Sequence, residues 1–369
     1  MTKNALKIGK KKSCKGKCKI PLVVICFILF PFTVNAQDIQ QTQYYNAIQY
    51  LNPAFVGSSH AFRGVSNLRT QWPGLQAKYT TLYMSADYNL SKYNSGVGGY
   101  MVIDRQGPSV IRSFETAFQY ASWVNLNQNY SLRFGLQASY QGKVLDYNQL
   151  TLPSTFNNNT QSYSGINPLL YDFHFKNTRY FDFASGVVLY SRNLWVGYAL
   201  YHLNRPESSF LTPWEMEKLA PRHDIIAGYK FESNIGKREN LYTNNFAITP
   251  TFLYKMQSKS DQLDAGTYVS FKNLMLGAWY RGIPVKSYNN NMNNESIIFL
   301  VGVKWNYFTV NYSYDFVISR LYGNSGGAHE INITFLYPLE EEFTIKNKRF
   351  KSLPCPRIQK DKRKFEIAY

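Results

Sequence analysis

The chain has 369 residues and a net charge of +18, and aromatic residues make up 17% of it. The mean hydropathy of −0.34 excludes an ordinary bundle of membrane-spanning helices, while the many Tyr and Phe residues favour β-strands. A transmembrane β-barrel stays compatible with this average, because half of each of its strands is polar.

Residues 1–36 have the pattern of a secretory signal peptide. A lysine-rich start precedes an apolar stretch from Ile20 to Val34, and the small residue Ala36 predicts cleavage before Gln37. The apolar stretch has about 15 residues, against roughly 20 for a helix that spans a bilayer. We therefore expect export. Three of the four cysteines leave with this segment, so the remaining Cys355 can form no intramolecular disulfide.

Strict alternation of apolar and polar residues marks the stretch 306–319, NYFTVNYSYDFVIS. Successive side chains of a strand point to opposite faces, so this pattern predicts a strand with one apolar and one polar face. The pattern recurs along the chain. We predict fourteen strands: 58–71, 76–89, 93–105, 109–124, 128–145, 180–191, 193–205, 222–233, 244–257, 262–271, 273–283, 295–304, 306–319 and 327–337.

The predicted connections differ in length between the two ends of the strands. One end has mostly tight turns, whereas the other includes the long segments 146–179, 206–221 and 284–294. Outer-membrane barrels have short periplasmic turns and long outer loops. We therefore predict an all-β fold, a transmembrane antiparallel β-barrel of about 14 strands with both termini in the periplasm. The expected order is a signal peptide (1–36), a periplasmic N-terminal segment (37–57), the barrel (58–337) and a basic periplasmic tail (338–369).

The polar faces of the predicted strands carry charges of both signs. A charge facing lipid costs about 2–4 kcal/mol near the bilayer midplane, so these residues are expected to face the lumen. The near balance of signs favours structural ion pairs, with a partner-binding site as the alternative. The predicted lumen charge network consists of Arg63, Arg69, Asp87, Asp104, Arg133, Arg222, Asp224, Arg281, Asp315 and Glu330. Aromatic residues near strand ends, among them Trp279 and Trp305, are expected to form interfacial girdles.

Candidate catalytic or metal-binding residues are scarce. The five histidines are scattered without an HxxxH or HxH spacing, so we expect no metal site, no cofactor and no enzyme. The glycine-rich run Gly96–Gly99 is followed by no helix, which argues against a phosphate loop. It is expected to let a strand bend or let inward side chains approach the wall. Export argues against nucleic acid as a partner of the basic tail.

Several short motifs follow one another in a characteristic order. The first is Asn52, Pro53, Ala54 and Gly57, followed by Gln71 and Trp72 at the end of the first predicted strand. Later pieces are Ser85 with Asp87, Asp104 with Gly107, GAWYR at 277–281 and GAHEI at 327–331. In this order, from about residue 44 to 337, the sequence resembles the PorP/SprF family of type IX secretion system membrane proteins from Bacteroidetes.

The resemblance implies an outer-membrane barrel that supports secretion or cell-surface attachment of partner proteins, such as adhesins used in gliding. It implies contact with the lipid bilayer, with secreted cargo, and with periplasmic and outer-membrane secretion components, and it implies no cofactor. The alternatives are an outer-membrane porin or small-solute channel, and a purely structural barrel. We expect loops 146–179 and 206–221 to hold a partner. The tail is expected either to contact periplasmic machinery or to be a solvated extension.

Overall fold

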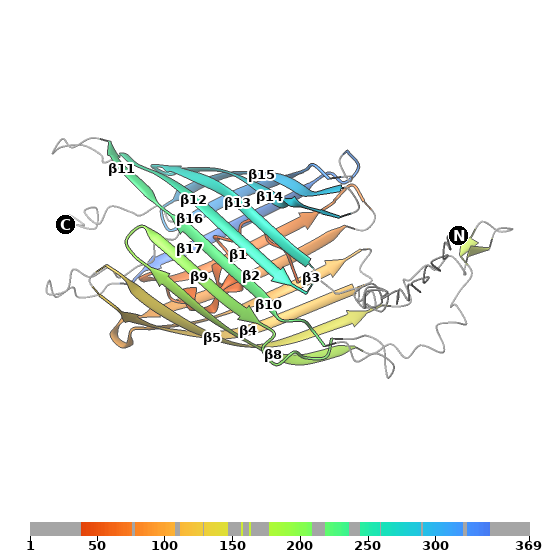
Figure 1. The fold of residues 1–369 in the computed structure, drawn as a ribbon, viewed down its shortest axis with the longest axis horizontal. Helices are drawn as coiled ribbons and strands as arrows, with labels where there is room; N and C mark the ends of the chain where they lie inside the picture. Colours follow the sequence, from red (N-terminus) through yellow and green to blue (C-terminus); the bar gives the residue numbers. More distant parts are fainter. Residues whose placement is uncertain are drawn as a thin grey trace, which may run out of the picture. The chain divides into compact units, whose positions relative to one another are not determined.

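The computed structural model describes most of the chain after the predicted signal peptide. The described residues are 38–75, 78–107, 111–127, 129–146, 156–157, 162–163, 177–208, 218–235, 244–258, 260–288, 291–319 and 323–339. The predicted signal peptide and nearly all of the basic tail lie outside these residues. Most of the described residues belong to one large sheet (Figure 1).

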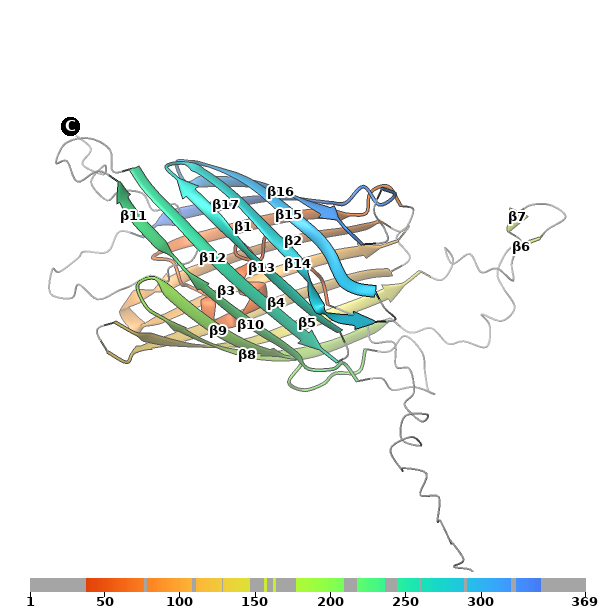
Figure 2. The same ribbon diagram turned by 45° about the horizontal axis from the view of Figure 1, so that its top comes forward.

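This sheet closes into a barrel whose tilted strands continue around the lumen (Figure 2). Neighbouring strands pair antiparallel, β1 pairs with β17, and β10 pairs with β12. Its strands are β1 (Ala61–Gln71), β2 (Tyr79–Leu90), β3 (Ser95–Gln106), β4 (Ile111–Asn125), β5 (Ser131–Leu145), β8 (Thr178–Tyr190), β9 (Leu194–Tyr201), β10 (Arg222–Tyr229), β11 (Phe231–Ile235), β12 (Asn244–Gln257), β13 (Ser260–Phe271), β14 (Leu274–Tyr288), β15 (Asn291–Trp305), β16 (Phe308–Val317) and β17 (Ala328–Pro338). The segments β10 and β11 pair with β12 in one continuous register, so the fifteen segments make fourteen strands. The predicted fourteen-stranded antiparallel barrel is confirmed.

The remaining described elements are short. The segments β6 (Phe156–Asn157) and β7 (Ser162–Tyr163) form a separate two-stranded ladder. One helical turn, α2 (Ile48–Leu51), is followed by the 3₁₀ turn η1 (Pro53–Phe55), and a second 3₁₀ turn, η2 (Ser91–Tyr93), connects β2 to β3. No helix among the described residues is long and apolar enough to cross a membrane.

The two faces of the wall have opposite character. Outward side chains are mostly large and apolar, and Phe118, Leu136 and Phe181 remain 63–65% exposed. Inward side chains are mostly polar or charged and yet buried, as Gln119 and Asp264 are, each with 0% exposure. A water-soluble protein buries its apolar side chains, so this inverted pattern is the one expected of a wall that faces lipid.

The two ends of the barrel differ, and we name them by their connections. At the turn end lie the tight connections β2–β3, β4–β5, β8–β9, β13–β14 and β15–β16, together with the start of β1 and the end of β17. At the loop end lie the connections β1–β2, β3–β4, β5–β8, β9–β10 and β16–β17. The long connections predicted at 146–179 and 206–221 belong to this loop end, although most of their residues lie outside the described ones. The long loop predicted at 284–294 is wrong, because β14 continues to Tyr288 and β15 begins at Asn291.

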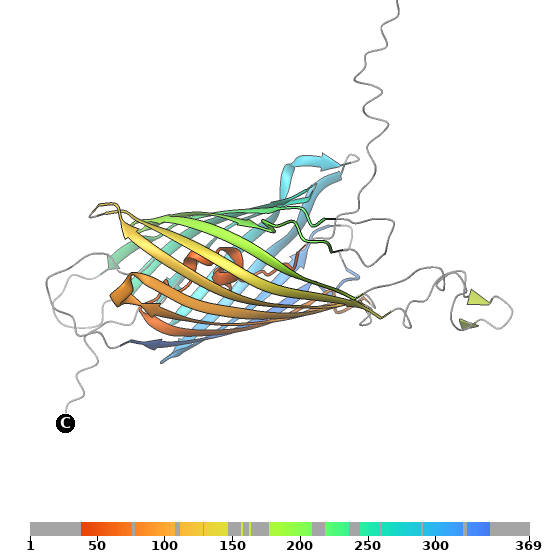
Figure 3. The same ribbon diagram turned by 90° about the horizontal axis from the view of Figure 1, so that it is seen from below.

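Residues 38–57, which we call the plug, lie inside this barrel. Figure 3 shows their helical turns enclosed by the strands. The plug begins at Asp38, which contacts His202 directly after β9 at the loop end, and it leads to β1, which begins at the turn end. The segment thus crosses the lumen. From the sequence we expected a periplasmic N-terminal segment at 37–57, whereas in the structure the side chains of residues 38–57 are mostly buried inside the barrel.

The crossing also separates the two ends of the described chain. Asp38 lies at the loop end, and Leu339, directly after β17, lies at the turn end. The termini themselves fall outside the described residues, so their location in the periplasm stays a prediction.

Candidate functional site: the plugged lumen

The motif at residues 52–57 contains the 3₁₀ turn η1 of the plug. The side chain of Asn52 caps η1 by accepting a hydrogen bond of 2.9 Å from the backbone N–H of Ala54. Its amide group also donates to the backbone carbonyls of Val187 (3.2 Å) and Tyr198 (3.1 Å) in the wall. Pro53 suits the first position of the turn, where no backbone N–H is needed. One asparagine therefore shapes the plug and joins it to β8 and β9.

Glycines in the wall make room for this turn. A Cβ atom built on Gly135 would overlap the backbone of Ala54, and one built on Gly186 would overlap the side chain of Asn52. Gly57 has a positive φ of 61°, and a Cβ there would lie 2.6 Å from the Cα of Gly96. The run Gly96–Gly99 was expected to let inward side chains approach the wall. At Gly96 it is the plug backbone that comes close, because a Cβ atom there would lie 2.5 Å from the carbonyl oxygen of Val56.

Gly135→Ala is expected to destabilise the barrel by about 1–3 kcal/mol, since the added methyl group meets backbone that cannot rotate away. The matched control is Gly64→Ala, because a Cβ on Gly64 has its nearest neighbour at 4.0 Å, an ordinary contact. The free energy of unfolding, from urea titration of the detergent-solubilised protein, measures both effects. Equal stability of the two variants would contradict close packing of plug and wall.

An ion pair on neighbouring strands holds the plug near the turn end. Arg63 of β1 and Asp87 of β2 lie directly opposite each other and form two hydrogen bonds of 2.6 and 2.9 Å. The Asp87 carboxylate also accepts from the Gln49 side chain at 2.9 Å and from the Gly57 backbone N–H at 2.7 Å. Nearby, Arg133 of β5 donates to the backbone carbonyls of Ala54 (2.8 Å) and Val56 (2.5 Å).

Glu330 of β17 is the main acceptor for the other half of the plug. Its carboxylate accepts from the backbone N–H groups of Thr42 (2.7 Å) and Gln43 (2.8 Å). It also accepts from the Asn67 side chain at 2.8 Å and forms an ion pair of 3.1 Å with Arg69, which lies directly opposite on β1. Glu330 is completely buried, so its charge is balanced by these four donors and not by water.

A second carboxylate extends this network along the wall from β17 toward β13. Asp315 of β16 accepts from Arg69 at 2.9 Å, from Arg281 at 3.1 Å and from the Thr42 hydroxyl at 2.7 Å. Arg281 of β14 also forms two hydrogen bonds, of 2.9 and 3.1 Å, with Asp264 of β13, directly opposite it. The Thr42 hydroxyl in turn accepts a hydrogen bond from Arg69. The plug is therefore part of a charge network that spans five strands.

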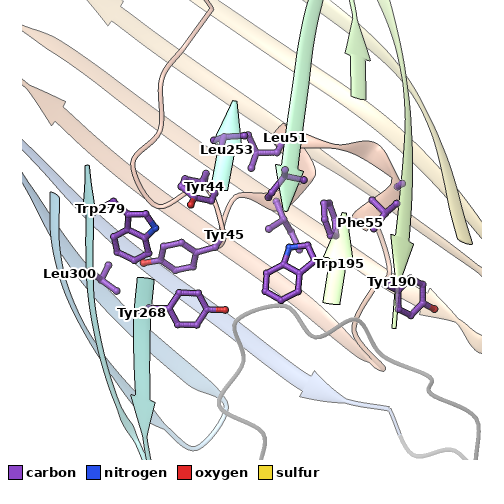
Figure 4. Packing of buried hydrophobic residues seen from close by; sticks show 14 of the residues in the cluster. Tyr44, Tyr45, Leu51, Phe55, Tyr190, Trp195, Leu253, Tyr268, Trp279 and Leu300 are labelled. Carbon is purple, nitrogen blue, oxygen red and sulfur yellow. The ribbon is translucent and has the colours of Figure 1, made fainter. Parts of the chain in front are cut away.

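Aromatic and aliphatic side chains of the plug and of the wall pack together inside the barrel (Figure 4). Tyr45 of the plug stacks on both Trp279 and Tyr268, with ring centroids 5.4 and 5.7 Å away, and these two wall rings are 6.3 Å from each other. The hydroxyl groups of Tyr44 and Thr251 share a hydrogen bond of 2.7 Å. The assignment of Trp279 to an interfacial girdle is wrong. Trp279 is inward and 3% exposed, because alternation along β14 puts it on the same face as Arg281. Trp305, in contrast, is outward and 76% exposed.

A histidine cluster fixes the start of the plug at the loop end. His202 lies between two carboxylates, 2.9 Å from Asp38 and 2.9 Å from Asp182, and Arg222 contacts Asp38 at 2.7 Å and Asp224 at 3.1 Å. Burial opposes a charge on His202, but the two carboxylates outweigh it and raise the pKa of His202 to about 9. Burial alone would raise the pKa of Asp38, yet His202 and Arg222 hold it well below its usual value.

This cluster makes stability depend on pH. The pKa of His202 is above its ordinary value of 6.5, so the stabilisation is complete below pH 6.5 and is lost as the pH rises through about 9. The difference corresponds to roughly 3 kcal/mol. His202→Gln is expected to remove most of the change in the free energy of unfolding between pH 6.5 and 9. The control His329→Gln, at an outward histidine, is expected to keep this pH dependence. Urea unfolding between pH 6 and 10 measures this, and an unchanged slope in His202→Gln would refute it.

The structure accounts for every residue of the predicted lumen charge network. All ten are buried on the inward face. Asp104 accepts hydrogen bonds from the side chains of Thr81 (2.5 Å) and Gln106 (2.9 Å). The other nine residues of the network take part in the ion pairs and hydrogen bonds described above. Of the motif residues outside the plug, Gln71 accepts from Arg69 at 3.3 Å, and Trp72, with φ of 55°, turns the chain after β1 and packs on Tyr79.

Sequence reasoning missed the partners within the plug: Asp38, Thr42, Gln43 and Gln49. They belong to no periodic pattern, and their partners are up to 288 residues away in sequence. A usable signal was the row of inward glycines near the turn end, which indicates that another backbone comes close. Among the described residues, no group of His, Cys, Asp and Glu could hold a metal ion.

Comparisons with solved structures find outer-membrane barrels of low sequence identity. The toluene transporter TbuX of Ralstonia pickettii has 10% identity and a TM-score of 0.44, covering 80% of this chain and 94% of its own. The outer membrane protein Omp33 of Acinetobacter baumannii has 7% identity and a TM-score of 0.38, covering 76% and 99%. Similarity this weak carries no functional argument, and no curated protein matches the chain.

A comparison with protein-family models identifies the family of this chain. The family model described as type IX secretion system membrane protein PorP/SprF matches residues 33–335, which includes the plug and nearly the whole barrel. The match confirms the resemblance inferred from the motifs at residues 52–57 and after β1. The chain belongs to the PorP/SprF family of type IX secretion system membrane proteins.

Proposed function

We propose that this outer-membrane barrel acts in type IX secretion as a closed platform that supports secretion or surface attachment of a partner protein, such as a gliding adhesin. The observation that carries the proposal is the plug, which crosses the lumen and is hydrogen-bonded to at least six strands along its way. Because the lumen is filled, the ends of the barrel are the surfaces that remain for binding a partner protein.

The alternative is an outer-membrane porin or small-solute channel. The inward side chains of an open channel contact water, as in porins with a polar, water-filled interior. Here Arg133, Arg281 and Glu330 are at most 1% exposed, and plug residues such as Gln43 are equally buried. Solute passage through this lumen therefore requires displacement of the plug, which disfavours a passive channel.

The partner's site belongs, in this proposal, to the loop end. Loops 146–179 and 206–221 are the longest connections there and hold the secreted partner, while the barrel anchors it in the membrane. The basic tail after residue 338 contacts periplasmic secretion components. Most of these residues lie outside the described ones, so the proposal rests on their length and composition.

The test is a comparison of surface and culture-fluid proteomes between a strain that lacks this gene and its parent. Loss of one or two large adhesins from the mutant supports a dedicated secretion partner, and loss of many secreted proteins supports a core component of the machinery. An unchanged proteome contradicts the proposal and favours the porin alternative. Re-expression of the wild-type gene is the control.

A further inference from the structure

Three outward arginines form a basic patch on the wall that faces lipid. Arg105 lies at the loop end of β3, Arg112 at that of β4 and Arg179 at that of β8, and all three are exposed. Among the strand residues whose side chains the structure describes, no other Lys or Arg points outward. The patch therefore gathers these outward cations on a surface that is otherwise mostly apolar or aromatic, with an outward carboxylate at Asp261 of β13, far along the sheet.

The register brings the charges of this patch together. Arg105 and Arg112 are directly opposite each other on β3 and β4. Like charges in this position are destabilising unless an anion or water lies between them. Within the described part of the chain, the structure gives none of the three arginines a carboxylate partner. An anion from outside the chain is the natural complement to them.

An aromatic row lies next to the arginines, on the side toward the middle of the barrel. Gly142 of β5 pairs with both Phe114 and Arg179, and the ring of Phe114 occupies the space that a side chain at Gly142 would fill. Tyr140 lies beside this ring and beside Phe181, with ring centroids 5.8 and 5.2 Å away. Together these rings form a continuous apolar surface just below the charges.

We propose that the basic patch binds the phosphate group of an anionic membrane lipid, whose acyl chains lie along Phe114, Tyr140 and Phe181. Guanidinium groups match phosphate oxygens with pairs of parallel hydrogen bonds, which a zwitterionic headgroup satisfies less well because its own cation competes. Charge above and aromatic rings below follow the order of groups in a lipid, from headgroup to chain. This site is independent of any secreted partner and requires only that the barrel lies in a membrane.

Native mass spectrometry of the full-length protein tests the site. The protein is released from mixed micelles that contain equal amounts of phosphatidylglycerol and phosphatidylcholine. We expect the wild type to retain phosphatidylglycerol preferentially, and the double variant R105Q/R112Q to lose about tenfold of this preference. The matched control is K92Q/K272Q, which removes two exposed cations from turns at the other end and is expected to behave like the wild type.

Two further measurements keep the result interpretable. If R105Q/R112Q does not fold, judged by its heat-dependent migration in gels, the single variant Arg179→Gln replaces it. Millimolar inorganic phosphate, added as a competitor, is expected to leave the lipid bound, because it lacks the acyl chains. The proposal is overturned if the folded arginine variants keep the wild-type preference for phosphatidylglycerol. It is also overturned if millimolar inorganic phosphate displaces phosphatidylglycerol from the wild type.

Discussion

Deletion of residues 38–57 is expected to turn a silent barrel into a conducting one. In the structure these residues occupy the lumen and cover the inward charges, among them Asp87 and Glu330. Without them, a wall of fourteen strands encloses space that only water and ions can fill. Single-channel recording in planar bilayers measures the change. We expect no stable current steps from the full chain and long-lasting open-channel current steps from the deletion variant.

The control truncates the chain after Leu339, which removes the 30 residues 340–369 and leaves the plug in place. A milder variant, T42A/Q49A/N52A, keeps the plug but removes three of its side-chain anchors, and we expect brief openings from it. Stable conduction by the full chain would contradict a blocked lumen. A deletion variant that folds but stays silent would show that something other than the plug closes the barrel.

The barrel wall was predictable because lipid and lumen impose opposite demands on alternate residues. The strand predicted at 244–257 is observed as Asn244–Gln257, and all fourteen predicted strands are present with shifts of a few residues at their ends. The inward charges were predictable for the same reason. Their pairing also follows from register, since Arg63, Arg69 and Arg281 each lie directly opposite a carboxylate on the neighbouring strand.

The plug was not predictable in the same way, because its conformation depends on distant partners. It has a four-residue helix, a 3₁₀ turn and extended stretches, so neither a period of 2 nor a period of 3.6 marks it. Without knowledge of their partners, the three tyrosines of the plug are compatible with a β-strand or with a membrane interface; they are Tyr44, Tyr45 and Tyr50. Trp279 shows the same limitation on the wall, since an aromatic residue near a strand end fits a girdle until its partner within the lumen is known.

The contrast between Arg133 and Arg69 shows what sequence can say about charges. Both were predicted to face the lumen, and both do. Arg69 pairs with carboxylates that the sequence also places on inward faces. Arg133 instead donates to backbone carbonyls of the plug and lies over the ring of Trp123 at 4.4 Å. A backbone acceptor leaves no trace in the composition, so this contact could not be foreseen.

The plug also links the two ends of the barrel by one continuous chain. Its start is held by His202 and Arg222 at the loop end, and its last residue, Gly57, is held by Asp87 near the turn end. A partner that binds at the loop end would therefore meet the beginning of the same segment whose other end leads into β1. The pH dependence predicted for His202 concerns only the first of these two attachments.

Glu330→Ala is expected to lower the free energy of unfolding by about 3–5 kcal/mol, the usual result of removing one partner from a buried ion pair. The substitution leaves Arg69 with one carboxylate fewer and deprives the backbone N–H groups of Thr42 and Gln43 of their acceptor. Urea unfolding in detergent measures the loss.

The control Glu232→Ala removes an exposed carboxylate paired with Lys230, an interaction worth about 1 kcal/mol at most. The comparison separates buried from surface charge because both variants delete one glutamate from an ion pair. If Glu330→Ala costs no more than Glu232→Ala, the carboxylate does not hold the plug, and the network that joins it to β1, β16 and β17 is not what stabilises the closed lumen.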